Sequence, residues 1–303
     1  MNICLVSLLE DILQNETIKD VSSSLGLAPG TVKRWINLAN VPRQYQFDLL
    51  KLANRDIDYS KYGYKDKDQF FTPPKTAKLC YEIFCKTIEN LGEGENDYSY
   101  IEPSAGSGTF LSVLPAGRLT AIDIEPQHPD VTQADFLTWQ PKLKNKYVVF
   151  GNPPFGLRGH MALNFINHSQ SFAEYVCFIL PQLFESDGKG VPRKRVKGFN
   201  LILSEKISNI FLSPSGEEMK VNVVFQIWSK NHSNKDYEIC NESDEDFSIY
   251  SLSDGGTPST TRNKKMLNNC DVYLPSTLFG NDKIELYKNS EDLASRKGYG
   301  IKI

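Results

Sequence analysis

A short loop with two consecutive prolines carries the strongest chemical signal in the sequence. The loop is Gly151-Asn152-Pro153-Pro154-Phe155-Gly156, and it follows an apolar run from Tyr147 to Phe150. The prolines fix the backbone and lack N–H donors, while the carbonyls remain free to accept hydrogen bonds. The Asn152 side chain adds an acceptor, and the Phe155 ring adds an aromatic face. Together they suit a planar amine, although the segment taken alone is equally well explained by a rigid loop without chemistry.

A glycine-rich loop comes earlier in the chain. It runs Glu102-Pro103-Ser104-Ala105-Gly106-Ser107-Gly108, after an expected strand and before an apolar run that we expect to be helical. Glycine lets the backbone turn sharply and approach a ligand, and a helix N-terminus offers free N–H groups. On its own, this segment could be a plain turn.

Two carboxylates follow at a spacing that fits a nucleoside-containing ligand. Asp123-Ile124 ends the next expected strand, where an acid can accept both hydroxyls of a ribose. Asp135-Phe136 then supplies an acceptor for an adenine amine beside an apolar ring that can cover the adenine face. A carboxylate at a strand end is often only a solvated turn residue, so the prediction depends on the whole ordered set.

Together with Phe70-Phe71-Thr72-Pro73-Pro74, these segments resemble, in order, the amino-methyltransferases of the gamma arrangement. The best-known members of that family are N6-adenine DNA methyltransferases of restriction-modification systems. The resemblance extends from Gln69 to Lys230. It implies S-adenosylmethionine as the cofactor, DNA as the substrate and a paired restriction nuclease as a partner that such systems can include.

The resemblance also implies a role for each matching residue. Thr72 and Pro73 would lie near the methionine part of the cofactor, with Glu102, Ser104 and Gly106 around the methionine and ribose. Asp123 would hold the ribose hydroxyls, Asp135 the adenine amine and Phe136 the adenine ring. The implied cofactor set is Phe71, Thr72, Pro73, Glu102, Pro103, Ser104, Gly106, Gly108, Asp123, Ile124, Asp135, Phe136 and Asn152. The implied catalytic set is Asn152, Pro153, Pro154 and Phe155.

The chemistry of an exocyclic adenine amine agrees with this assignment. Its lone pair is delocalised into the ring, which makes it a poor nucleophile. Acceptance of both N–H bonds, by Asn152 and the Pro153 carbonyl, favours a more tetrahedral nitrogen. The target base must leave the duplex stack, and stacking on Phe155 offsets part of that free energy. No strong general base is required, since the nitrogen becomes acidic once it is methylated.

A parallel sheet must bring these segments together. Short apolar runs typical of strands alternate with helical stretches, at 98–101, 119–124, 147–150, 175–180 and 221–228. This alternation predicts an α/β fold. With the resemblance, we expect a Rossmann-like, seven-stranded sheet of the S-adenosylmethionine-dependent methyltransferase type, closed by an antiparallel hairpin over 206–230. Phe211 is a candidate to pack on the target base, and a core role is at least as good an explanation.

Residues 18–38 have the spacing of a helix-turn-helix, with apolar positions on two helices and Gly26 at the turn. They resemble such modules of regulators and phage proteins. The second helix, from about Pro29 to Leu38, would present Thr31, Lys33, Arg34 and Asn37 to a DNA major groove. The alternative is a small all-α bundle used for folding or dimer contact.

A second basic segment lies beside the expected pocket and includes Arg193, Lys194, Arg195 and Lys197. Charge runs usually form a solvated face, but this one is a candidate phosphate clamp. The chain as a whole has a net charge of −3, so contacts with nucleic acid must come from such local patches.

Composition and segment boundaries complete the prediction. We expect three parts: a helix-turn-helix domain at 1–60, a catalytic domain at 68–230, and a C-terminal extension at 231–303 that is a candidate for a small target-recognition region. The six cysteines form no CxxC pair, so neither a zinc site nor a disulfide framework is expected. No apolar run reaches the length of a membrane span, and we expect a cytoplasmic protein.

Three other functions compete with this prediction. Enzymes that methylate adenine in structured RNA also carry an Asn-Pro-Pro-Phe loop. Enzymes that methylate glutamine amides bind a planar amide in the same way, but typically have Tyr at the position of Phe155. A catalytically inactive DNA-binding regulator is the third alternative.

Overall fold

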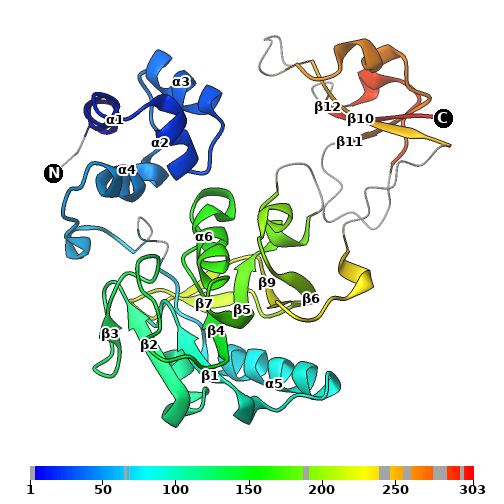
Figure 1. Ribbon diagram of the computed structural model, residues 1–303. Coiled ribbons are helices and arrows are strands. Elements are labelled where there is room, and N and C mark those ends of the chain that lie inside the picture. Colours follow the sequence, from blue (N-terminus) through cyan, green and yellow to red (C-terminus); the bar gives the residue numbers. More distant parts are fainter. Residues whose placement is uncertain are drawn as a thin grey trace. The chain divides into compact units, whose positions relative to one another are not determined.

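The computed structural model describes residues 4–64, 67, 69–186, 191–238, 246–254, 261–275, 285–293 and 297–303. The chain forms two compact units, Met1–Ile239 and Cys240–Ile303. The first unit holds both the N-terminal helices and the large sheet (Figure 1). The predicted boundary near residue 60 therefore lies within one compact unit.

Four helices make up the N-terminal bundle: α1 (Leu5–Leu13), α2 (Ile18–Ser24), α3 (Pro29–Asn37) and α4 (Gln46–Leu52). α2 starts at a capping box, in which Thr17 accepts from the backbone N–H of Asp20. α3 starts with Pro29 at its first turn, a position where the missing N–H is not needed. Gly26, with φ of +62°, turns the chain between the two helices.

The bundle closes around its own apolar core. Val21 of α2, Val32 and Trp35 of α3 and Leu49 of α4 are buried in it. Leu157, which follows the Asn152 loop in the catalytic part, also packs against this core. The outer face of α3 exposes Lys33, Arg34 and Asn37, with Thr31 partly exposed. α2 and α3 thus cover the segments predicted to be helical, whereas the helix-turn-helix assignment and the DNA-reading role of α3 stay predictions.

A seven-stranded sheet with the order β3-β2-β1-β4-β5-β9-β6 forms the centre of the first unit. Its strands are β1 (Ser99–Glu102), β2 (Leu119–Asp123), β3 (Thr132–Gln133), β4 (Tyr147–Gly151), β5 (Ala173–Pro181), β6 (Asn200–Lys206) and β9 (Val223–Ser229). β1 to β5 pair in parallel, whereas β9 runs antiparallel to both β5 and β6. The prediction of an α/β fold with a seven-stranded sheet and a reversed strand near its end is confirmed.

Side chains of the central strands contribute to two hydrophobic cores, one on each face of the sheet. Along β4, Val148 and Phe150 belong to one core, and Tyr147 and Val149 to the other. α5 (Pro74–Asn90) covers the first face and α6 (His160–Ser169) the second (Figure 1). The buried residues of α5 include Ala77, Cys80, Phe84 and Ile88. Their spacing of three or four residues places them on one side of the helix, which packs against the sheet.

The crossover from β1 to β2 differs from the prediction. The apolar run after the glycine loop forms only two short 3-10 turns, Thr109–Ser112 and Ala116–Arg118. Pro115 disfavours helical conformation in the residue before it and lacks an N–H to donate, so the run cannot continue as an α-helix. The glycine loop is therefore followed by a 3-10 turn, and the expected α-helix N-terminus is absent from this crossover.

A small hairpin, β7 (Ile210–Leu212) and β8 (Glu218–Lys220), lies between β6 and β9 in sequence. Phe71 pairs with Leu212, with N–O distances of 2.8 and 2.9 Å. Phe211 is only 1% exposed and belongs to the core. Its suggested contact with a target base is therefore wrong for this conformation, and the core alternative holds.

The second unit is a three-stranded antiparallel sheet with the order β10-β12-β11. The strands are β10 (Ser248–Ser253), β11 (Val272–Pro275) and β12 (Lys297–Lys302). A small core of Leu252, Leu267, Tyr273 and Leu293 supports one face. Tyr287 forms an isolated antiparallel bridge to Tyr273.

None of the described helices is long and apolar enough to cross a membrane.

Candidate active site

A pocket opens where the carboxyl ends of β1, β2 and β4 meet, the edge at which ligands bind in open α/β sheets. All predicted cofactor residues except Pro73 and Gly108 line it. Pro73 instead caps the start of α5, and Gly108 holds a left-handed turn with φ of +80°. The predicted cofactor-binding and catalytic residues that line the pocket are Phe71, Thr72, Glu102, Pro103, Ser104, Gly106, Asp123, Ile124, Asp135, Phe136, Asn152 and Pro154.

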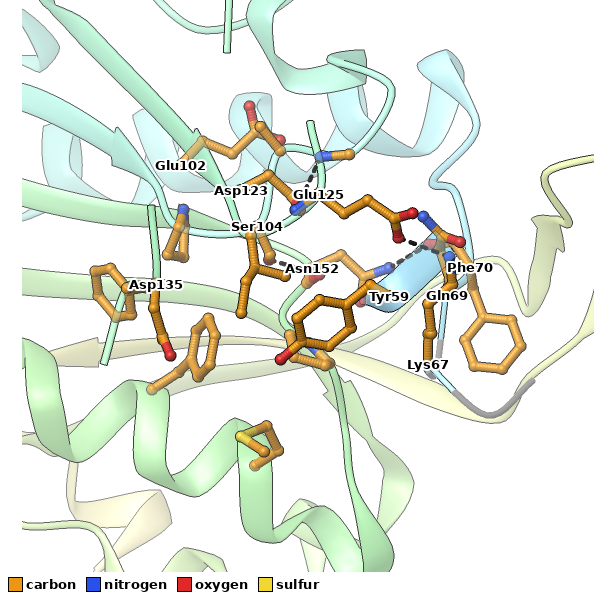
Figure 2. A pocket seen from close by; sticks show the side chains of 18 of the residues that line it. Tyr59, Lys67, Gln69, Phe70, Glu102, Ser104, Asp123, Glu125, Asp135 and Asn152 are labelled. Atoms are coloured by element: carbon orange, nitrogen blue, oxygen red, sulfur yellow. Dashed lines mark hydrogen bonds and ion pairs between the residues drawn. The ribbon is translucent and has the colours of Figure 1, made fainter. Parts of the chain in front are cut away.

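The side chain of Asn152 is fixed in one orientation. Its Nδ2 donates to the backbone oxygen of Phe70 at 3.3 Å, and Ser104 Oγ donates to the Asn152 backbone oxygen at 3.1 Å (Figure 2). Since the amide nitrogen must face a carbonyl, Oδ1 is the end left over. Oδ1 is buried and has no hydrogen-bond partner among the described residues. A buried acceptor of this kind is available to a donor from a ligand.

The rest of the loop is less exposed to the pocket than predicted. Pro154 lines it, but Pro153 and Phe155 are not among the lining residues. Phe155 is partly buried against the core under α5. The Phe155 backbone oxygen accepts from the N–H groups of Met161 and Ala162, so the loop is tied to the first turn of α6.

Glu102, at the end of β1, is a second buried group in need of a partner. It is 2% exposed, and its Oε2 has no hydrogen-bond partner among the described residues. Burial raises the pKa of the carboxyl well above its usual value, and the nearby charge of Asp123 adds to the effect. A ligand ammonium group would satisfy Oε2 and favour the charged form, so this position suits an amine.

Asp123, at the end of β2, holds the glycine loop in place. Its Oδ2 accepts from the N–H of Gly106 and its Oδ1 from the N–H of Glu125, both at 2.8 Å (Figure 2). Burial nevertheless raises the pKa of this carboxyl. Each carboxylate oxygen can accept more than one hydrogen bond, so capacity remains for hydroxyl groups of a ligand. Gly106 has φ of +48°, and a Cβ there would lie 3.1 Å from the Phe71 ring.

Asp135 and Phe136 lie side by side farther along the pocket. Asp135 Oδ1 accepts from the N–H of Leu137 at 3.0 Å, and its Oδ2 lies 2.7 Å from Lys51 Nζ. Phe136 is 2% exposed and packs against Phe165, with ring centroids 5.0 Å apart. The pocket therefore presents a carboxylate next to a fixed apolar ring.

Four lining residues that the sequence analysis did not name precede the catalytic motifs: Phe47, Lys51, Tyr59 and Lys67. All four come from α4 or from the segment that follows it. Lys67 Nζ forms an ion pair with Glu125 at 2.6 Å (Figure 2). Burial, aided by the charges of Asp135, Asp48 and Glu125, raises the pKa of Tyr59 to about 12, so its hydroxyl stays neutral. Tyr59 and Lys67 lie in a polar segment without a recognisable motif, so the sequence gave no signal that they line the pocket.

The basic segment at 193–197 divides into buried and exposed residues. Arg193 is 8% exposed; it donates to the backbone oxygen of Tyr237 and lies over the Tyr237 ring. Arg195 donates to the backbone oxygen of Gly26 at 3.3 Å. Lys194 and Lys197 are exposed. The expectation that Arg193 faces phosphate is therefore corrected, because its guanidinium anchors the fold.

No metal centre is apparent in the part of the chain that the structure describes: no three His, Cys, Asp or Glu side chains are grouped to hold an ion.

No protein-family model and no curated protein matches the chain. Among solved structures it is similar to the Pyrococcus horikoshii protein PH1948, an inferred RNA methyltransferase, with 18% identity, a TM-score of 0.40, and 54% of this chain and 88% of that chain covered. It is also similar to the type IIG restriction endonuclease BpuSI, with 16% identity, a TM-score of 0.42, and 77% and 37% of the two chains covered.

A third similar structure is a modification subunit of an inferred type I restriction enzyme from Vibrio vulnificus YJ016. Identity is 11%, the TM-score is 0.36, and 87% of this chain and 64% of that chain are covered. At these TM-scores, the function has to be argued from the site itself.

Proposed function

We propose that the protein is an S-adenosylmethionine-dependent methyltransferase that modifies the N6 amine of an adenine in DNA. The observation that carries the proposal is the buried, unpartnered Oδ1 of Asn152, held in orientation by the Phe70 carbonyl. An acceptor fixed in this way can take one N–H bond of a planar amine, and the following prolines leave carbonyl groups to take the other.

The cofactor site is supported by the unpartnered groups around it. Glu102 Oε2 suits the ammonium group of the methionine part, and Asp123 has capacity for the ribose hydroxyls. Asp135 and Phe136 offer an acceptor and a ring to the adenine. When bound, the cofactor supplies a methyl group activated by its sulfonium.

The residues of this chain then act on the target amine. Asn152 orients the amine by accepting a hydrogen bond from one of its N–H groups, so that the nitrogen lone pair becomes available. Phe155 is partly exposed but lies outside the pocket lining, and we include it in the proposal as the aromatic face for the flipped base. The site needs no general base, because the methylated nitrogen loses its proton readily to solvent.

DNA is favoured over RNA by the N-terminal bundle. α3 exposes Lys33, Arg34 and Asn37 on its outer face, a composition suited to base edges and phosphates. Lys194 and Lys197 add exposed positive charge in the second basic segment. We include both sets in the proposed DNA contacts.

The direct test is incubation of the purified protein with labelled S-adenosylmethionine and, separately, unmethylated DNA, structured RNA and a protein extract. Each sample is digested and the labelled unit is identified by mass spectrometry. N6-methyladenine in DNA alone supports the proposal. Label in RNA or on glutamine overturns the substrate, and no label together with no cofactor binding in a titration favours an inactive regulator.

A further inference from the structure

One wall of the pocket is built by the N-terminal bundle rather than by the catalytic motifs. α4 contributes Phe47 and Lys51, and the 3-10 turn that follows contributes Tyr59. The rings of Phe47 and Tyr59 pack against each other with centroids 5.3 Å apart. Figure 2 shows the Tyr59 side chain among those that line the pocket. The bundle thus brings both apolar surface and charge to a site that binds a ligand.

The charge that the bundle brings is the Lys51 ammonium group, which lies next to Asp135, the proposed acceptor for the adenine amine. Lys51 Nζ lies 2.7 Å from Asp135 Oδ2, and both side chains remain partly exposed, at 37% and 27%. Asp135 Oδ1 is already engaged by the Leu137 N–H at 3.0 Å. The pair therefore presents a single unit to the pocket: a carboxylate that accepts next to an ammonium that donates.

That unit is complementary to the edge of an adenine. The amine of adenine donates, and the ring nitrogens on either side of it, N1 and N7, only accept. A carboxylate alone satisfies the amine and leaves the neighbouring ring nitrogen without a donor. A carboxylate with an ammonium beside it satisfies both.

We propose that Lys51 is a cofactor-binding residue, which donates a hydrogen bond to an adenine ring nitrogen of S-adenosylmethionine while Asp135 accepts from the adjacent amine. The inference rests on the proposed function, since it concerns the same cofactor. It makes the N-terminal bundle part of the cofactor site as well as a candidate DNA reader. Phe47 and Tyr59 complete that wall as apolar cover.

Lys51 could instead only neutralise Asp135 when no ligand is bound, and the two roles predict opposite changes in cofactor affinity when Lys51 is removed. If the Lys51 ammonium served only to occupy Asp135 in the empty pocket, its removal would free the carboxylate and tighten cofactor binding. If it binds the adenine, its removal weakens binding.

The experiment measures the Kd of S-adenosylhomocysteine by calorimetry for the full chain and three variants. Lys51→Met keeps an unbranched side chain as far as Cε and removes the ammonium group; we expect about a tenfold rise in Kd. Lys51→Arg keeps a donor and should recover most of the affinity. Lys19→Met makes the same change on an exposed position of α2 and should leave Kd unchanged. Thermal melting of each variant checks that it is folded.

Analogues identify the contact. With 1-deaza- and 7-deaza-S-adenosylhomocysteine, one of the two should bind the wild-type protein more weakly and show no further loss in Lys51→Met. An unchanged or lower Kd for Lys51→Met overturns the inference, as does equal loss of affinity for both analogues in both proteins. If the wild-type chain binds no S-adenosylhomocysteine at all, the proposed function has failed, and this outcome differs from every result expected of Lys51.

Discussion

The backbone oxygen of Phe70 holds Nδ2 of Asn152 at 3.3 Å, which leaves Oδ1 as the end of the amide that faces a ligand. Phe70, the first residue of the Phe70–Pro74 segment, thus sets the direction in which the Asn152 side chain can accept a hydrogen bond. This contact joins two motifs that lie far apart in sequence.

Replacement of Asn152 by Ala should lower kcat by about 100-fold or more, because an oriented hydrogen-bonding group at a reacting centre is worth that much. The Kd for S-adenosylhomocysteine should rise much less than kcat falls, since Glu102, Asp123 and Asp135 of the proposed cofactor site are unchanged. Asn152→Asp keeps an acceptor but loses the donor to Phe70, and should be intermediate. A fully active Asn152→Ala protein would refute the role of this loop.

Glu102→Gln should separate cofactor binding from stability. Because the folded-state pKa of Glu102 is raised, its contribution to stability is complete below the unfolded-state pKa and falls as pH rises through the folded-state value. Because Gln does not ionise, Glu102→Gln without cofactor should have a higher melting temperature than the wild type. The difference in melting temperature should grow from acidic to neutral pH. The gain should be roughly 3 °C for each unit by which the pKa is raised.

The same variant should bind the cofactor more weakly, because a neutral amide replaces the carboxylate opposite the ammonium group. Melting curves across the pH range, with and without S-adenosylhomocysteine, measure both effects. A variant that melts like the wild type at every pH would show that Glu102 is not perturbed by burial.

Arg193 and Lys194 are neighbours with different expected roles. Arg193→Ala removes a buried donor to the Tyr237 backbone and should lower the free energy of unfolding by about 1–3 kcal/mol. Lys194→Ala should leave the melting temperature unchanged and weaken DNA binding, with a salt dependence reduced by about one unit of slope. Urea unfolding and DNA binding at several salt concentrations test the pair, and equal effects on stability would contradict the division.

The proposed DNA face of α3 is best tested by point variants. Deletion of residues 1–60 would also remove Phe47, Lys51 and Tyr59 from the pocket, so lost activity would not identify a DNA contact. Lys33→Ala and Arg34→Ala should weaken DNA binding and leave the cofactor Kd unchanged. If neither changes DNA affinity or site preference, the bundle is not a DNA reader.

Gly298→Ala should destabilise the second unit. A Cβ at this position of β12 would lie 2.0 Å from the backbone oxygen of Leu274 in β11, and a backbone atom cannot move aside without breaking the strand pairing. We expect a loss of about 1–3 kcal/mol, measured by urea unfolding. Gly117→Ala, where a Cβ would meet nothing within 4 Å, is the matched control.

The sequence predicted the strands and the pocket motifs because both follow local rules. Buried parallel strands are recognisable in a sequence as short apolar runs. The carboxyl ends of these strands bring Glu102, Asp123 and Asn152 to one edge of the sheet. The crossover after the glycine loop was mispredicted because a buried apolar run looks the same in an α-helix and in 3-10 turns. The pocket contacts of Lys51 and Tyr59 depend on how the bundle docks, and no local pattern encodes docking.

The packing of Leu157 in the bundle core has a consequence for protein engineering. The residue lies just beyond the Asn152 loop, and Gly26 of the bundle would, with a Cβ, come within 2.5 Å of His160 at the start of α6. A foreign reader domain spliced on at residue 60 would not match these surfaces. Chimeras that aim to change sequence specificity should therefore graft only the outer face of α3 and keep the scaffold of the bundle.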